Sequence, residues 1–176
     1  MENITDARYP IGKYMPQPYS EKQKEAWLAD ILFNPRQLEM AVLNLDEAQL
    51  NTPYRDGGWS VKQLVHHVAD SHMNAYMRFK LGLTEDNPTI KPYQEDKWAE
   101  LSDSALAINI SLTLLHCLTN RWYDILKHMK EDDWQKTVFH PEHQKSITLW
   151  HLLGMYSWHG KHHLAHITSL RERMGW

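Results

Sequence analysis

The sequence contains little cysteine and little glycine. Cys117 is the only cysteine among 176 residues, which excludes a disulfide within the chain. It lies between leucines, so we expect a small buried apolar side chain and not a nucleophile. Seven glycines are few for a turn-rich β fold, and the apolar residues recur at helical spacing. Together these features favour an all-α protein.

Basic runs and long apolar runs are also missing. The net charge is −3 with neutral histidines, and no segment is rich in lysine and arginine. Because binding to phosphate backbones needs a basic surface, we expect no nucleic-acid partner. No apolar run reaches the roughly 18 residues of a membrane span, and the first residues lack a signal-peptide pattern. We therefore expect no membrane partner and a cytoplasmic location.

Four long periodic segments predict four helices in one domain over residues 1–176. The prolines of residues 1–19 predict an extended arm. The helices are expected at about 20–45, with a kink or a restart at Pro35, and at 60–83, 103–129 and 148–174. Ser20, Ser60 and Thr148 are the expected N-caps. On the third helix we expect a buried face with seven apolar residues: Leu106, Ile110, Leu114, Leu118, Trp122, Ile125 and Met129. These lengths indicate a four-helix bundle.

Two long connections separate these helices. Residues 84–102 form a crossover that is either a binding loop or a segment packed by its own Tyr93 and Trp98. Residues 131–147 are expected to be irregular, with a short extended piece at 137–140.

Histidines are concentrated in the last predicted helix, at positions 159, 162, 163 and 166. His159 and His163 are four residues apart and share the apolar stripe of that helix, whereas His162 lies toward its polar side. On the second helix His67 lies on the apolar face, and His66 points away from it. We therefore predict that His67, His159 and His163 enter one bundle core.

Three inward imidazoles suit a divalent metal ion. A lone buried histidine is usually a core residue bonded to a carbonyl, but three in one core each need a polar partner, which a shared ion supplies. Three neutral nitrogen ligands suit Zn²⁺, our first choice, or Ni²⁺ or another divalent ion, and they leave coordination positions open. A pair shifted to His162 and His166 remains an alternative. Asp70, His72 and His166 are candidate catalytic residues because they are close in sequence to the ligands.

Two motifs resemble a known family. The segments Tyr54–Val61 and Val65–Asn74, and the segment His159–Ile167 with the ending Arg173-Met174-Gly175-Trp176, are similar to the DinB-like superfamily and, within it, to the YfiT group. The resemblance covers nearly the whole chain. It implies a bundle with up-down-down-up connectivity and the ligands His67, His159 and His163. It also implies that His166, where many relatives have glutamine, supports the site or faces the substrate.

The resemblance also implies an activity. The YfiT group is described as metal-dependent hydrolases, often homodimeric, and related members are S-transferases that use the low-molecular-weight thiol bacillithiol. We therefore expect a small-molecule substrate and a metal-activated water. A thiol S-transferase is the second hypothesis, because a metal can also hold a thiolate. A metal-stabilised structural protein or a ligand-binding module without turnover is the third.

Overall fold

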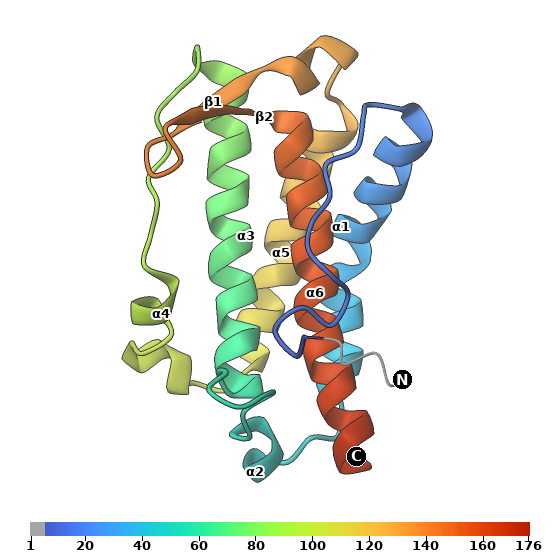
Figure 1. Ribbon diagram of the computed structural model, residues 1–176, viewed down its shortest axis with the longest axis vertical. Helices are drawn as coiled ribbons and strands as arrows, with labels where there is room; N and C mark the ends of the chain where they lie inside the picture. The colour runs from blue at the N-terminus through green and yellow to red at the C-terminus, as the bar shows by residue number, and fades with distance from the viewer. Residues whose placement is uncertain (1–5) are drawn as a thin grey trace.

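The computed structural model describes residues 6–176, in which four long helices form a bundle (Figure 1). These are α1 (Glu21–Val42), α3 (Val61–Thr84), α5 (Asn109–Lys127) and α6 (Leu149–Met174). Helix α1 packs against α5 and α6, and α3 packs against the same two helices. The helices α1 and α3 therefore occupy opposite corners of the bundle.

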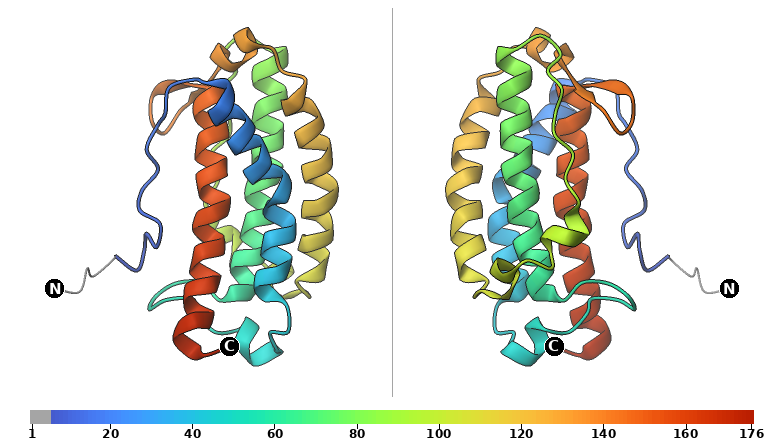
Figure 2. Two further views of the ribbon diagram at one scale, coloured as in Figure 1. Left: turned by 90° about the vertical axis from the view of Figure 1, so that its right-hand side faces the viewer. Right: turned by 90° about the vertical axis from the view of Figure 1, so that its left-hand side faces the viewer.

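The connectivity follows from the long crossover. In Figure 1, α1 runs downward, α3 and α5 run upward, and α6 runs downward. The segment after Thr84 returns the chain along the outside of the bundle, so that α3 and α5 are parallel neighbours (Figures 1 and 2). The predicted all-α bundle with up-down-down-up connectivity is confirmed.

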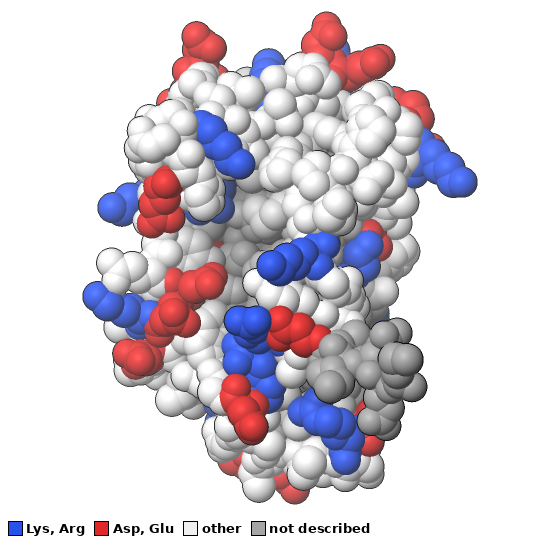
Figure 3. Space-filling view, in the orientation of Figure 1, with Lys and Arg blue, Asp and Glu red and all other residues white. Residues whose placement is uncertain are grey.

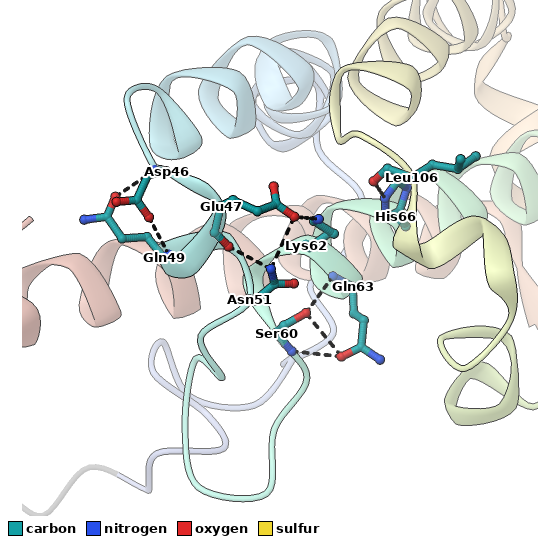
Figure 4. A network of polar contacts seen from close by, with 9 residues as sticks. All are labelled: Asp46, Glu47, Gln49, Asn51, Ser60, Lys62, Gln63, His66 and Leu106. Carbon is teal, nitrogen blue, oxygen red and sulfur yellow. Dashed lines mark hydrogen bonds and ion pairs between the residues drawn. The ribbon is translucent and has the colours of Figure 1, made fainter.

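The three expected N-caps bond as predicted. Ser60 Oγ accepts a hydrogen bond from the backbone N–H of Gln63, whose side chain accepts one from the backbone N–H of Ser60. Ser20 and Thr148 accept equivalent bonds at the starts of α1 and α6. Each cap satisfies an N–H group that the first helical turn leaves free. Figure 4 shows the Ser60 cap beside the short helix α2 (Glu47–Leu50), whose Glu47 pairs with Lys62.

The connections contain more structure than the sequence predicts. The crossover holds α4 (Glu95–Trp98) and the 3-10 turn η1 (Ser102–Ala105), and a second turn η2 (Glu131–Gln135) follows α5. The extended piece at 137–140 is strand β1 (Thr137–His140), which pairs antiparallel with β2 (Lys145–Thr148). Residues 131–147 are therefore a turn and a hairpin that lead into α6.

The third helix differs from the expectations in its start, in part of its buried face and in the exposure of Cys117. Helix α5 begins at Asn109, and its buried side includes Leu112, Leu115 and Trp122. The expected stripe holds in its C-terminal part, whereas three of its first residues are exposed: Leu106, Ile110 and Leu114. Cys117 is exposed as well. Apolar residues occupy two adjacent stripes of this helix. In its first turns, the stripe that packs against α1 and α3 is not the one that the sequence periodicity predicted.

The core has two parts with the histidines between them. Near the hairpin it is aromatic, with Phe79, Trp122 and Trp150, and near the opposite end it is mostly aliphatic, with Leu64 and Leu115. The predicted arm, of which residues 1–5 lie outside the described residues, runs along α6 (Figure 2). Helix α1 continues through Pro35 without a restart. Within residues 6–176, no helix has the length and apolar character that would span a bilayer.

Candidate metal centre

Helices α3 and α6 bring three histidines together in the middle of the bundle. The Nε2 atom of His159 lies 3.3 Å from Nε2 of His67 and 3.0 Å from Nε2 of His163. One ring nitrogen from each of the three lies within 4.8 Å of the others. The spacing of four residues places His159 and His163 on one side of α6, and α3 supplies His67 from across the interface.

Hydrogen bonding alone does not explain this convergence. A ring nitrogen offers either one proton or one lone pair, so Nε2 of His159 cannot bond well to both neighbours. Two nitrogens bound to Zn²⁺ at 2.0–2.1 Å with tetrahedral angles lie about 3.3 Å apart. The observed separations of 3.3 and 3.0 Å match that value closely. The three side chains therefore fit a single divalent ion.

Burial keeps the three rings in the form that binds metal. His67 is 4% exposed, and burial lowers its pKa to about 4. Burial and the neighbouring histidines lower the pKa values of His159 and His163 well below the usual range. Neutral imidazole is the coordinating form, so at neutral pH no proton must be removed before an ion binds. The ring of Trp59, 4.6 Å from that of His67, covers this histidine from one side.

Two pockets meet at this cluster. The first has a volume of about 590 Å³ and extends from His159 toward the hairpin, between α3, α6 and the crossover. The second, of about 370 Å³, contains all three histidines and reaches the arm and the loop before α3. His159, Glu95 and Asp96 line both pockets. Figure 3 shows the hollow on this face, with charges of both signs around it.

The acidic pair Glu95-Asp96 was missed by the sequence analysis. It lies in α4, in the middle of the crossover, and lines the same pockets as His159 because that segment runs along α3 and α6 (Figure 2). Glu95 is exposed at the surface, but its partial desolvation against the pocket, together with the negative charge of Asp96, raises its pKa. Tyr93 packs against Trp98 in a tilted arrangement, with ring centroids 4.5 Å apart, and lines the first pocket. The crossover is therefore both packed by its own aromatic residues and part of the pocket wall.

His162 and His166 form a second pair on α6, with their Nε2 atoms 3.1 Å apart. We expected His162, on the polar side of α6, to be largely free, and this is wrong, because its side chain is only 8% exposed. The arm covers it: the ring of Tyr9 lies 6.1 Å from His162, and Trp158, which stacks on His162, donates a hydrogen bond to Gly12 O. His166 packs on Tyr54 and lines the second pocket.

Asp70 and His72 lie outside the two pockets. Neither residue lines either pocket, and burial with the charge of Asp103 raises the pKa of Asp70 to about 6. His72 is fully buried, and its ring contacts Trp122 and Tyr156. The side chain of His66 turns toward α5, where it bonds to Ser111 Oγ and Leu106 O. Its direction away from the cluster agrees with the sequence analysis.

Comparisons with known proteins agree with this architecture. The DinB superfamily model matches residues 31–167. A protein of Bacillus cereus named "Putative metal-dependent hydrolase" is 51% identical over 174 residues, which cover 98% of this chain and 100% of the relative. A relative of Bacillus thuringiensis with the same description has the same identity and coverage.

Solved structures give the same result. YfiT from Bacillus subtilis, described as a probable metal-dependent hydrolase with an unusual four-helix bundle topology, superposes with a TM-score of 0.95. It is 48% identical, and the match covers 98% of this chain and 99% of that one. A mycothiol-dependent maleylpyruvate isomerase matches at a TM-score of 0.61 and 18% identity, over 79% of this chain and 60% of that one. This second likeness concerns the fold alone.

Proposed function

The chain belongs to the DinB superfamily, and we propose that it is a metal-dependent hydrolase whose ion is held by His67, His159 and His163. The convergence of three buried, neutral imidazole nitrogens on one point supports this proposal most strongly. Three protein ligands leave at least one coordination position free for a water or a substrate, which is the arrangement of catalytic sites.

The residues around the proposed ion would transfer protons and limit the access of water. A bound divalent ion supplies a water whose pKa is lowered toward neutrality and a Lewis acid for a carbonyl group. Glu95 lines both pockets beside His159, and its raised pKa suits a side chain that accepts and returns a proton. Trp59 and Tyr54 limit the access of bulk water from the second pocket. Replacing Glu95 with glutamine should lower kcat and leave the metal content unchanged.

A thiol S-transferase is the second candidate, and the two pockets favour it. A hydrolase needs one organic substrate besides water, whereas a transferase needs space for two. The pockets of about 590 and 370 Å³ meet at the histidines and could hold one reactant each. The ion would hold the thiol as a thiolate, since coordination removes its proton. An assay that offers an aryl halide with and without a small thiol separates this activity from ester or amide hydrolysis.

The decisive experiment measures metal content by elemental analysis of untagged protein. We expect about one equivalent per chain for a single three-histidine site. His67→Ala should lose the ion. His66→Ala is the matched control on the same helix, because this neighbour bonds to α5, and it should retain the ion once circular dichroism shows that it is folded. Equal metal content in the two variants would overturn the assignment.

The alternative ligand pair is tested in the same way. His159→Ala and His163→Ala should lose the ion, whereas His162→Ala should keep it. His166→Ala should keep it with altered turnover, since neighbours of a ligand tune the ion more than they hold it. The reverse pattern would identify His162 and His166 as ligands. A protein that binds metal but turns over neither esters, amides nor thiols would be a structural or ligand-binding protein.

Three finer features complete the proposal. Zn²⁺ is the first choice of ion because it accepts three imidazoles in tetrahedral geometry, with Ni²⁺ as the alternative. A cytoplasmic location, expected from the sequence, is part of the proposal. A homodimer is proposed as well, and the apolar residues that η1 and α5 expose, Leu106, Ile110 and Leu114, are a surface that a second copy could cover. Sedimentation velocity measures that state directly.

A further inference from the structure

The first pocket contains an arginine without an acidic partner. Arg78 lies on α3 and lines the pocket, and its Nη1 donates a hydrogen bond of 2.8 Å to the hydroxyl of Tyr156. Within residues 6–176, no carboxylate oxygen lies within 4.0 Å of its guanidinium, although ion pairs occupy several other lysines and arginines. The remaining N–H groups of Arg78 are available to a ligand, because guanidinium carries five donors.

The position of Arg78 fits a substrate that also reaches the proposed ion. Arg78 follows His67 by eleven residues, about three full helical turns, so both lie on the same face of α3 with Cα atoms about 16 Å apart along the axis. Tyr156, which accepts the bond from Arg78, packs against His159 with ring centroids 6.3 Å apart. Because the side chain of Arg78 is long, its guanidinium can lie closer to the histidines than the separation of the Cα atoms indicates. A molecule of several carbon atoms can therefore contact both ends of the pocket.

The surroundings of Arg78 favour a single negative charge. Burial lowers the pKa of His140, with smaller contributions from the charges of His143 and Arg78. His143 stacks on His140 with ring centroids 4.2 Å apart. Three carboxylates line this pocket, against the two cations Arg78 and Lys97: Glu142 in the exposed turn of the hairpin, and Glu95 and Asp96 in the crossover. These carboxylates repel a phosphate dianion more strongly than a carboxylate. A planar carboxylate also matches the two-pronged donor geometry of guanidinium.

We propose that the first pocket binds a substrate with a carboxylate group, held by Arg78 and placed so that its reactive end reaches the three histidines. The proposal rests on the proposed function for the reactive end only, because Arg78 and its pocket do not depend on the ion. The substrate class is a small molecule that carries a carboxylate. Arg78 is the residue that determines this specificity.

Binding is tested with hexanoate as the probe and isothermal titration calorimetry as the readout. The arms are hexanoate, neutral hexanamide and hexyl phosphate, each titrated into the wild-type protein, Arg78→Gln and Lys80→Gln. Lys80 is the matched control, because it lies two residues further along α3, is exposed, and carries the same charge. We expect Arg78→Gln to weaken hexanoate roughly 10- to 100-fold, the range for a hydrogen-bonded charge pair, and Lys80→Gln to leave it unchanged.

The other arms decide the class of ligand. Tighter binding of hexyl phosphate than of hexanoate would overturn the carboxylate assignment, and so would equal binding of hexanamide. An Arg78→Gln protein that still binds hexanoate as tightly as the wild type would overturn the role of Arg78. Circular dichroism of Arg78→Gln shows that the variant is folded, and Arg78→Lys, which restores the charge without the forked geometry, should recover part of the affinity.

A second measurement separates this proposal from the proposed function. The same titrations are repeated in the His67→Ala background, where no ion is expected. If hexanoate binding still depends on Arg78 there, the anion site stands whatever the catalytic role of the histidines. If the wild type binds metal but its hexanoate affinity does not depend on Arg78, the proposed function stands and the carboxylate site is refuted.

Discussion

Replacing His72 with leucine should stabilise the metal-free protein, and more so in mild acid. His72 is fully buried, and neither of its ring nitrogens has a hydrogen-bond partner among the described residues. An unsatisfied buried polar group costs roughly 1–3 kcal/mol. Leucine has a similar volume and no polar atom, and Trp122 and Tyr156 surround the site with aromatic surface. We therefore expect His72→Leu to raise the free energy of unfolding by about 1–3 kcal/mol at pH 7.5.

The pH dependence gives a second magnitude. Burial, with a smaller contribution from the charge of His67, lowers the pKa of His72 to about 4, below the 6.5 of an exposed imidazole. Between these values the unfolded chain binds the proton and the folded protein does not, so stability falls as the pH falls through 6.5. Between pH 7.5 and pH 5.5, His72 alone should lower the free energy of unfolding by about 1 kcal/mol. His72→Leu should remove that part of the acid sensitivity.

Urea denaturation followed by circular dichroism, with a chelator present at both pH values, measures the two effects. His128→Leu is the control, because His128 is exposed at the end of α5 and its replacement should not stabilise the fold. A destabilised His72→Leu protein would mean that His72 makes polar contacts in solution. An unchanged difference between pH 7.5 and 5.5 would mean that its ring is not held neutral, and either result would refute the reasoning.

Three shorter predictions concern packing, reactivity and metal release. Gly160→Ala places a Cβ 2.5 Å from Nδ2 of Asn34, so it should destabilise the fold by roughly 1–3 kcal/mol in urea titrations, and an unchanged midpoint would show that Asn34 moves aside freely. Cys117 should react with a thiol reagent in the native protein, whereas a reaction that needs denaturant would contradict its exposure. Because burial lowers the pKa of His67 to about 4, equilibrium dialysis should find similar metal affinity at pH 8 and 6, followed by a loss as the pH approaches 4.

Local signals in the sequence predicted the starts of α1, α3 and α6 and the inward direction of His67, His159 and His163. The Ser60 cap depends on residues three positions apart, so it forms wherever the helix lies. His67 and His159 each share a single clear apolar stripe, which leaves little choice about the side that faces the core. Whether these residues hold a metal remains a prediction.

Contacts between distant segments explain what the sequence did not predict. Two apolar stripes lie side by side on α5, and only the partners α1 and α3 decide that Leu115 is buried and Leu114 exposed. His162 lies on the expected side of α6, but the arm covers that side. Glu95 lines the pockets because of the path that an irregular crossover takes, and sequence periodicity does not predict the path of a loop.

The order of helices around the bundle has a consequence for folding. Consecutive long helices here do not pack as antiparallel hairpins, because α1 and α3 are diagonal, α3 and α5 run parallel, and α5 and α6 are diagonal. The contacts of α1 with α6 join segments more than 100 residues apart, a large contact order for a helical protein. Closing such loops costs entropy before packing repays it, so folding should be slower than in up-and-down bundles of similar size. His67 and His159, 92 residues apart, therefore meet only when the bundle has closed.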